Sequence, residues 1–186
     1  MRKIVSNFFI SLDGVVEAPD QWHFPYFDEE MGAVVGQGFA TTDATLMGCT
    51  LYSEWSEYWP EHGDDDFGQT INNMPNYVVS DSLEDATWTN STLVRGNEAA
   101  ERLRLLKTEL DGDLTLSGCA TTVRWLLAEG LLDELRLLVH PIAVGHGQRL
   151  FEGTPTHPLK LVESQALKSG VLNLTYAPDP NPPTAA

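Results

Sequence analysis

The chain has 186 residues, of which 42% are hydrophobic and 20% charged, a composition typical of a globular domain rather than a disordered chain. Its formal net charge of −16 argues against nucleic acid as a partner, because the nucleic-acid phosphates would be repelled. No apolar run approaches the ~18 residues of a membrane-spanning helix, and two cysteines imply no disulfide framework. We therefore expect a cytoplasmic protein with neither a nucleic-acid nor a membrane partner.

The first part of the chain predicts a strand, a loop and a helix. Residues 3–10 predict a strand rather than a signal peptide, because Ser6 and Asn7 interrupt the short apolar run. Residues 28–39 predict a helix with acidic residues in its first turn. The loop at 11–26 has an Asp-Gly turn followed by aromatic residues, a composition that fits either a flat heterocycle or a hydrophobic lid over the core. These residues are Trp22, His23, Phe24, Tyr26 and Phe27.

The middle of the chain predicts short elements. Residues 44–47 form a buried strand ending at Gly48, and a helix at 50–58 follows, which Thr50 can cap. The stretch HGDDDFG, residues 62–68, predicts a solvated loop. Two further strands are expected at 76–80 and 91–95.

The last part of the chain predicts three more strands and two helices. Apolar residues recur at helical spacing from Ala99 to Leu110, and a strand at 113–117 leads into a second helix. A strand at 133–140 precedes an antiparallel hairpin at 158–177 that turns at Ser169-Gly170. The tail, residues 178–186, is rich in proline and small residues and predicts disorder.

Alternating strands and helices followed by a hairpin predict an α/β fold. The sheet is expected to be mostly parallel and covered on both faces, with antiparallel strands at one edge. Ligands of such sheets bind at the carboxyl ends of the strands. The candidate ligand-binding segments are therefore residues 11–16, 48–50, 80–81 and 117–122.

The junction SGCATT, residues 117–122, contains only small residues. Small residues allow a phosphate to approach the positive end of the helix, which favours a pyrophosphate cradle. The same residues equally permit tight packing of the helix on the sheet, with a threonine as its N-cap. Gly48 and Thr50 offer either a second phosphate contact or an ordinary strand–turn–helix. No histidine or cysteine pattern has metal-ligand spacing, so we expect no metal.

Seven segments together resemble the dihydrofolate reductase-like proteins. The resemblance is strongest to the C-terminal reductase domain of the riboflavin-biosynthesis deaminase/reductase and its stand-alone relatives, and it covers residues 2–177 as one domain. Its segments are SLDG, WHFPYFDEEM, DATLMGCTLY, NYVVS, STLVRG, the long run from LTLSGCATT to GHGQRLF, and the closing hairpin. The resemblance implies a three-layer α/β fold on a mixed sheet, mostly parallel with a C-terminal antiparallel hairpin.

The resemblance also implies an oxidoreductase that transfers hydride from NADPH to a pterin- or aminopyrimidine-like ring. The implied activity is of the 5-amino-6-(5-phosphoribosylamino)uracil reductase type, from riboflavin biosynthesis. Relatives are often homodimers, so the resemblance also implies a homodimer. The implied cofactor-binding residues are Leu12, Gly14, Val15, Val16, Gly48, Cys49, Thr50, Ser80, Ser117, Gly118, Cys119, Ala120, Thr121 and Thr122. The implied substrate-binding residues are Trp22, Phe24, Phe27, Met31 and Tyr52.

Two positions of the expected cofactor site depart from the family pattern. Cys49 stands where relatives commonly have an arginine after the strand-end glycine, so a guanidinium that pairs with phosphate is missing. Asp81 follows Ser80 where relatives often carry a basic residue, and its charge would repel the adenosine 2′-phosphate. These departures leave NADH, or a dimeric ligand-binding protein without turnover, as alternatives. Arg95 and Arg124 are candidates to compensate.

The proton that accompanies the hydride needs a donor. Asp13 is the candidate catalytic acid, with a bound water as the alternative. Burial of Asp13 under Trp22 and Phe24 is expected to raise the pKa of its carboxyl toward working pH.

Overall fold

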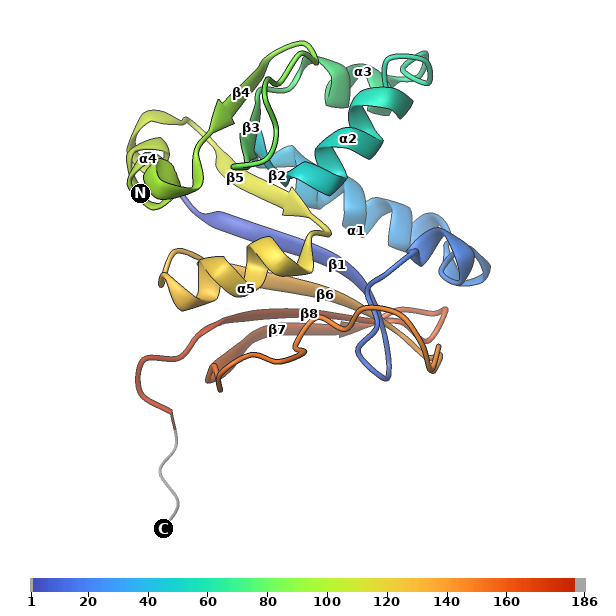
Figure 1. Ribbon diagram of the computed structural model, residues 1–186. Coiled ribbons are helices and arrows are strands. Elements are labelled where there is room, and N and C mark those ends of the chain that lie inside the picture. Colours follow the sequence, from blue (N-terminus) through green and yellow to red (C-terminus); the bar gives the residue numbers. More distant parts are fainter. Residues whose placement is uncertain (1, 183–186) are drawn as a thin grey trace.

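Residues 2–182 are described by a computed structural model, in which all strands join one mixed sheet (Figure 1). The strand order is β4-β3-β2-β5-β1-β6-β8-β7. The strands are β1 Ile4–Ser11, β2 Thr42–Gly48, β3 Asn76–Val79, β4 Ser91–Val94, β5 Asp113–Ser117, β6 Glu134–His140, β7 Leu159–Ala166 and β8 Leu172–Pro178. The helices are α1 Glu29–Ala40, α2 Cys49–Tyr58, α3 Asp66–Asn73, α4 Gly96–Glu109 and α5 Ala120–Ala128, with 3-10 turns at Pro19–Gln21 and Phe24–Tyr26.

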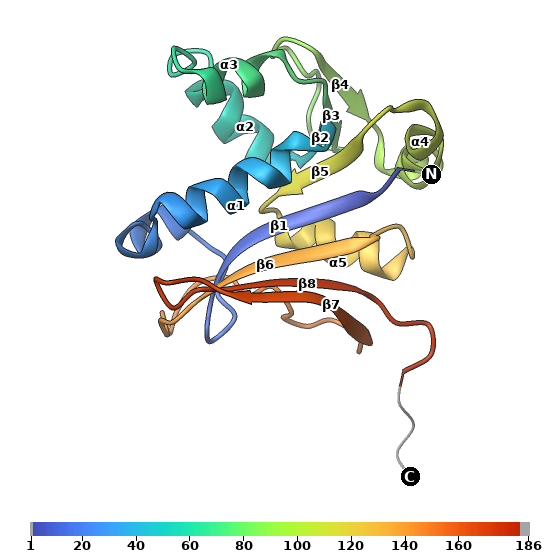
Figure 2. The same ribbon diagram turned by 180° about the vertical axis from the view of Figure 1, so that it is seen from behind.

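Helices cover both faces of this sheet because successive strand residues point to opposite sides. In β2, Leu46 packs with Leu103 of α4 and Leu126 of α5, whereas the next residue, Met47, packs with Tyr52 of α2 and other residues of the opposite face. Figure 1 shows α4 and α5 on the first face, and Figure 2, from behind, shows α1 across the second. The expected three-layer architecture is confirmed.

Strands β2 and β5 pair in parallel, but the connections that leave them run to opposite faces of the sheet. The chain leaves β2 into α2 on one face of the sheet and leaves β5 into α5 on the other. Adjacent strands whose connections diverge in this way open a crevice at their carboxyl ends, where ligands of parallel sheets bind. The antiparallel β7 and β8 extend the sheet beyond β6, as the terminal hairpin predicted.

The structure corrects two local expectations. The predicted solvated loop at 62–68 contains the start of α3, whose N-cap Asp65 accepts a hydrogen bond from the backbone N–H of Gly68. Helix α2 begins at Cys49 with Gly48 as its N-cap, so Thr50 lies inside the helix and does not cap it. Of the tail predicted to be disordered, Pro178 ends β8, and residues 183–186 lie outside the described part.

Candidate functional site

The junctions after β2 and β5 lie against each other. A Cβ added to Gly48 would stand 2.6 Å from Sγ of Cys119 and 3.0 Å from Oγ1 of Thr122. The Cys119 Sγ and Thr122 Oγ1 atoms are themselves 3.0 Å apart. A side chain at position 48 would therefore collide with the start of α5. This is the tight packing of helix on sheet that was one of the two alternatives for residues 117–122.

The start of α5 has a second property that packing does not require. Cys119, the N-cap, adopts the left-handed region at φ 65° and gives no side-chain cap, so the expected threonine cap is absent. Among residues 2–182, no carbonyl accepts a hydrogen bond from the backbone N–H groups of Cys119, Ala120, Thr121 or Thr122. Gly118 precedes them at φ 74°, and a Cβ there would meet nothing within 4 Å. The turn thus combines N–H groups that have no carbonyl partner with open space on the Cβ side of Gly118.

Helix α2 is also uncapped at its N-terminus, unlike α1 and α3. Asp28 accepts a hydrogen bond from the backbone N–H of Met31 at the start of α1, and Asp65 caps α3 in the same way. Gly48 gives α2 no side-chain cap. The two uncapped helix starts therefore meet at the ends of neighbouring strands, where their partial positive charges add.

The end of β3 is closed by its own side chains. The buried Ser80 hydroxyl accepts hydrogen bonds from the backbone N–H groups of Ser82 and Leu83 at 3.2 and 3.0 Å. The carboxylate of Asp81 accepts from the backbone N–H of Gly96 at 2.9 Å, so it caps α4. Arg95 donates to the carbonyl oxygens of Ser80 and Leu83, and its guanidinium is thereby committed to holding this turn.

Arg124, the other candidate compensating cation, is likewise committed. Its guanidinium donates to the carbonyl oxygens of Leu150, at 2.8 Å, and Arg149. The side chain thus ties α5 to the loop after β6 and does not point to solvent. Neither candidate arginine therefore replaces the guanidinium that relatives commonly have at the position of Cys49.

The loop after β1 is held by Asp13. Its carboxylate accepts hydrogen bonds from the Ser11 hydroxyl at 2.7 Å and from the backbone N–H groups of Val144 and Gly145 at 2.9 and 2.8 Å. The Arg149 guanidinium lies 3.7 Å from the same carboxylate and donates to the Asp13 carbonyl. Asp13 therefore joins two loops that are about 130 residues apart in the sequence.

These bonds act on the pKa of Asp13 in the opposite direction from the one expected. The hydrogen bond from Ser11, followed by those from Val144 and Gly145, lowers the pKa of the carboxyl to about 2. Each donor stabilises the charged carboxylate, and burial contributes too little to reverse the effect. The expected raised pKa is wrong, and Asp13 is ionised near neutral pH.

The aromatic loop presents two exposed rings. Phe24 is 63% exposed and Phe27 45% exposed, and the loop residue Leu12 is 71% exposed. Behind them, His23 is sandwiched between Phe9, at 4.5 Å between ring centroids, and Phe24, at 4.2 Å. Trp22 is buried, and its indole N–H donates to the carbonyl oxygen of Glu17 at 3.2 Å.

A pair of buried histidines supports this loop, although His23 was predicted only as one of the aromatic residues of the loop. The His23 and His140 ring centroids are 6.0 Å apart. Burial lowers the pKa of both imidazoles, and the His140 Nδ1 lies 2.8 Å from the carbonyl oxygen of Leu138. Within residues 2–182, His23 Nδ1 and His140 Nε2 have no hydrogen-bond partner. The run of aromatic residues around His23 was the feature of the sequence that could have indicated its packing role.

Besides Trp22, four predicted site residues place their side chains in the core. Met31 is fully buried among Leu138 and the β7–β8 turn, and the Tyr52 hydroxyl accepts a hydrogen bond from the backbone N–H of Trp88 at 2.8 Å. Val15 is 1% exposed and Ala120 2% exposed. The expected substrate contacts of Met31 and Tyr52 are therefore not available, and Val15 and Ala120 can offer a ligand only their backbones.

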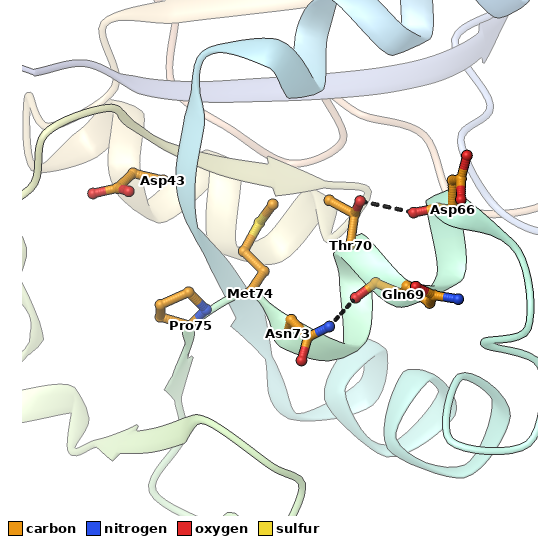
Figure 3. A pocket seen from close by; sticks show the side chains of 7 residues that line it. All are labelled: Asp43, Asp66, Gln69, Thr70, Asn73, Met74 and Pro75. Carbon is orange, nitrogen blue, oxygen red and sulfur yellow. Dashed lines mark hydrogen bonds between the residues drawn. The ribbon is translucent and has the colours of Figure 1, made fainter.

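A hollow of about 550 Å³ lies at the opposite, amino edge of the sheet (Figure 3). Two of its polar side chains bond within α3, in the hydrogen bonds from Asn73 to the Gln69 carbonyl and from Thr70 to the Asp66 carbonyl. Its lining residues are Asp43, Asp66, Gln69, Thr70, Asn73, Met74 and Pro75. None of the uncapped helix starts or exposed aromatic rings belongs to it, so we place the candidate site at the carboxyl edge.

Two further findings describe the part of the chain that the structure covers. No group of three or more histidine, cysteine, aspartate or glutamate side chains is arranged to hold a metal ion. No helix there has the length and apolar character needed to cross a membrane.

Comparisons with known proteins agree with this architecture. The chain is 26% identical to the uncharacterized protein YyaP of Bacillus subtilis (strain 168) over 181 residues, which is 94% of each chain. The deaminase/5-amino-6-(5-phosphoribosylamino)uracil reductase of Thermotoga maritima superposes with a TM-score of 0.67 at 14% identity, over 96% of this chain and 57% of that one. Dihydrofolate reductase from Enterococcus faecalis, complexed with NADP(H), superposes with a TM-score of 0.62 at 14% identity, over 95% and 96%. The model of the RibD C-terminal domain matches residues 2–173, and the chain belongs to that family.

Proposed function

We propose that this protein is an NAD(P)H-dependent reductase of the riboflavin-pathway type, which transfers hydride to a small pterin- or aminopyrimidine-like ring. The observation that carries the proposal is the meeting of two uncapped helix N-termini, of α2 and α5, at the carboxyl ends of β2 and β5. Their free donors and partial positive charge match the pyrophosphate of a dinucleotide. Membership of the RibD C-terminal domain family supports the reductase class.

The residues present fit the pyrophosphate part of such a cofactor. The backbone N–H groups from Cys119 to Thr122 would hold its oxygens, beside the open space at Gly118. Thr50 and Thr121 are exposed at the two helix starts, where their hydroxyls can add further hydrogen bonds. Cys49 and the packed Gly48 contribute backbone only.

At the adenosine end of the proposed cofactor site, both NADPH and NADH are candidates. NADPH is the first candidate, because the dihydrofolate reductase relative is complexed with NADP(H). At the β3 end, however, Asp81 is negative, Arg95 donates to carbonyls, and the Ser80 hydroxyl is already used within its own turn. NADH, which lacks the 2′-phosphate, is therefore the second candidate.

On this proposal the aromatic loop binds the ring that is reduced. Exposed Phe24 and Phe27 offer stacking faces, with His23 fixed behind them. A bound nicotinamide supplies the hydride. Because its hydrogen bonds lower the pKa of Asp13, we assign this carboxylate to positioning the loop of residues 12–16 and assign the supply of the proton to water.

The test places a carboxylate at the exposed start of α5. Thr121→Glu favours the helix through its dipole but repels a pyrophosphate, so it should weaken NADPH and NADH binding at least tenfold while stability holds or rises. Gln37→Glu is the control, since it adds the same charge near the end of α1 at the amino edge. Fluorescence titration measures both. Unchanged binding in Thr121→Glu, or no binding of either cofactor to the wild type at millimolar concentration, would overturn the proposal.

A dimeric ligand-binding protein without turnover is the second candidate. Asp81 favours this second candidate. Its carboxylate caps α4 at the place where the 2′-phosphate of a bound NADPH would need a cation. Oxidation of a bound nicotinamide, followed at 340 nm with candidate ring substrates, separates the two. Turnover eliminates the binding protein, and tight ring binding without turnover eliminates the reductase.

A further inference from the structure

The basic residues of this chain are distributed very unevenly. Between Lys3 and Arg95 the sequence contains no lysine or arginine, but it contains sixteen of the 27 acidic residues. The other eleven acidic residues are matched in number by the eleven basic ones, so residues 4–94 carry the whole net charge of −16. This segment builds the aromatic loop, α1, the junction after β2 and the end of β3.

The arginines that approach the carboxyl edge from elsewhere are already engaged. Arg149 lies on Asp13, Arg124 on the carbonyls of residues 149 and 150, and Arg95 on the turn after β3. Lys168, in the β7–β8 turn, is exposed, and its backbone N–H donates to the Glu30 carboxylate. Its ammonium is therefore a basic group without an ion pair among the described residues, near the start of α1, where the acidic residues Asp28, Glu29 and Glu30 outnumber it.

The aromatic loop itself is surrounded by negative charge. Asp20 is close enough to His23 for its charge to act on the imidazole, and Asp28, the N-cap of α1, follows Phe27 directly. Glu29 and Glu30 occupy the first turn of α1. The faces of phenylalanine rings are also electron-rich and attract cations rather than anions.

We propose that the ring bound at this loop carries no phosphate and is a neutral or cationic flat heterocycle. A phosphate is held by arginine, by lysine or by the free N–H groups of an uncapped helix start. This wall is dominated by carboxylates and aromatic faces, and Asp28 already caps the start of α1. The substrate class thus differs from that of the Thermotoga maritima relative, whose name specifies a phosphoribosyl compound. This inference rests on the proposed function in taking the aromatic loop as the substrate wall.

Pairs of ligands that differ only in a phosphate test the proposal without any cofactor. We would titrate the whole protein with riboflavin and FMN by fluorescence, and with cytidine and CMP by saturation-transfer NMR, at low salt. The expected result is that the unphosphorylated member of a pair binds at least tenfold more tightly. Equal or tighter binding of the phosphorylated member overturns the proposal, as does failure of all four compounds to bind at 5 mM.

Salt and a charge reversal sharpen the test. At about 1 M salt charges are screened within about 3 Å, so the preference should shrink severalfold. Asp20→Lys should also shrink it, whereas Asp111→Lys, at the amino edge between α4 and β5, should leave it unchanged. An equal effect of the two variants would contradict a local cause.

The outcome is separable from that of the cofactor experiment. Preference for the phosphorylated ligands with normal cofactor binding overturns this inference alone. Loss of cofactor binding with the unphosphorylated preference intact overturns the reductase alone.

Discussion

Cys119 packs directly against Gly48, so that a Cβ on Gly48 would lie 2.6 Å from the Cys119 sulfur. This contact joins the two uncapped helix starts. We expect Gly48→Ala to force the junctions apart, to lower the free energy of unfolding by about 1–3 kcal/mol, and to weaken cofactor binding. Urea denaturation measures the first effect and fluorescence titration the second.

The double variant Gly48→Ala/Cys119→Ala is the control, because it removes the sulfur that the new methyl group meets. It should recover much of the stability lost in Gly48→Ala, a coupling that separates a local clash from general damage to the strand. Strictly additive effects of the two substitutions would contradict the packing described here.

Asp13 gives stability a defined dependence on pH. Its folded pKa of about 2 lies below the ~3.9 of an unfolded aspartate, so the stabilisation is complete above about pH 4 and is lost as the pH falls toward 2. Asp13→Asn should be less stable than the wild type above pH 4 and should flatten the profile between pH 4 and 2. Urea midpoints at half-unit steps measure this. Asp111→Asn serves as the control and should leave the wild-type slope.

The same variant examines the proton source. If water supplies the proton, Asp13→Asn should lower turnover through loss of loop position without removing a titration from the pH profile of kcat. Disappearance of an acidic group from that profile would return Asp13 to the role of catalytic acid.

Much of the architecture was predictable from the sequence because it depends on local patterns. Apolar periodicity located α4 and the closing hairpin, and small residues located the junction at 117–122. The start of α3 was missed because the run of aspartates suggests a solvated loop, although Asp65 is a helix cap.

The site was less predictable because its decisive contacts are distant in the sequence. The largest cause of the lowered Asp13 pKa is Ser11, two residues away, but nothing nearby in the sequence indicates that Val144 and Gly145 lower it further. The spacing of Met31 and Tyr52 likewise does not reveal which side of each helix faces the core.

Buried His140 predicts a second dependence of stability on pH, of a different origin. Burial lowers the pKa of His140 and of His23 below the ~6.5 of an unfolded histidine, because the charged forms lose water. The unfolded chain then binds more protons than the folded one below pH 6.5, so stability falls as the pH drops through that value. His140→Phe keeps an aromatic ring and should reduce the slope between pH 7.5 and 5.

The control for this prediction is His62→Phe. His62 is exposed and stacked on Tyr58, away from the aromatic loop, so its replacement should leave the slope unchanged. Equal slopes in the wild type and His140→Phe would show that His140 does not contribute.

Substitutions of Asp81 test two effects of this residue, one on the stability of α4 and one on the preference between NADPH and NADH. Asp81→Arg removes both the cap of α4 and the negative charge, so it should cost about 1 kcal/mol of stability. If the 2′-phosphate lies beside the β3 end, the same variant should raise the ratio of NADPH to NADH affinity severalfold.

Asp81→Asn separates these effects, since the asparagine side-chain oxygen can still accept from the backbone N–H of Gly96 but the side chain carries no charge. It should keep most of the stability and raise the affinity ratio by a smaller factor than arginine does. A ratio that stays constant across aspartate, asparagine and arginine would mean that the 2′-phosphate lies elsewhere, because a charge change of two units within hydrogen-bonding reach of a phosphate cannot leave its binding unaffected. The turn held by Arg95 would then be a purely structural closure of the sheet.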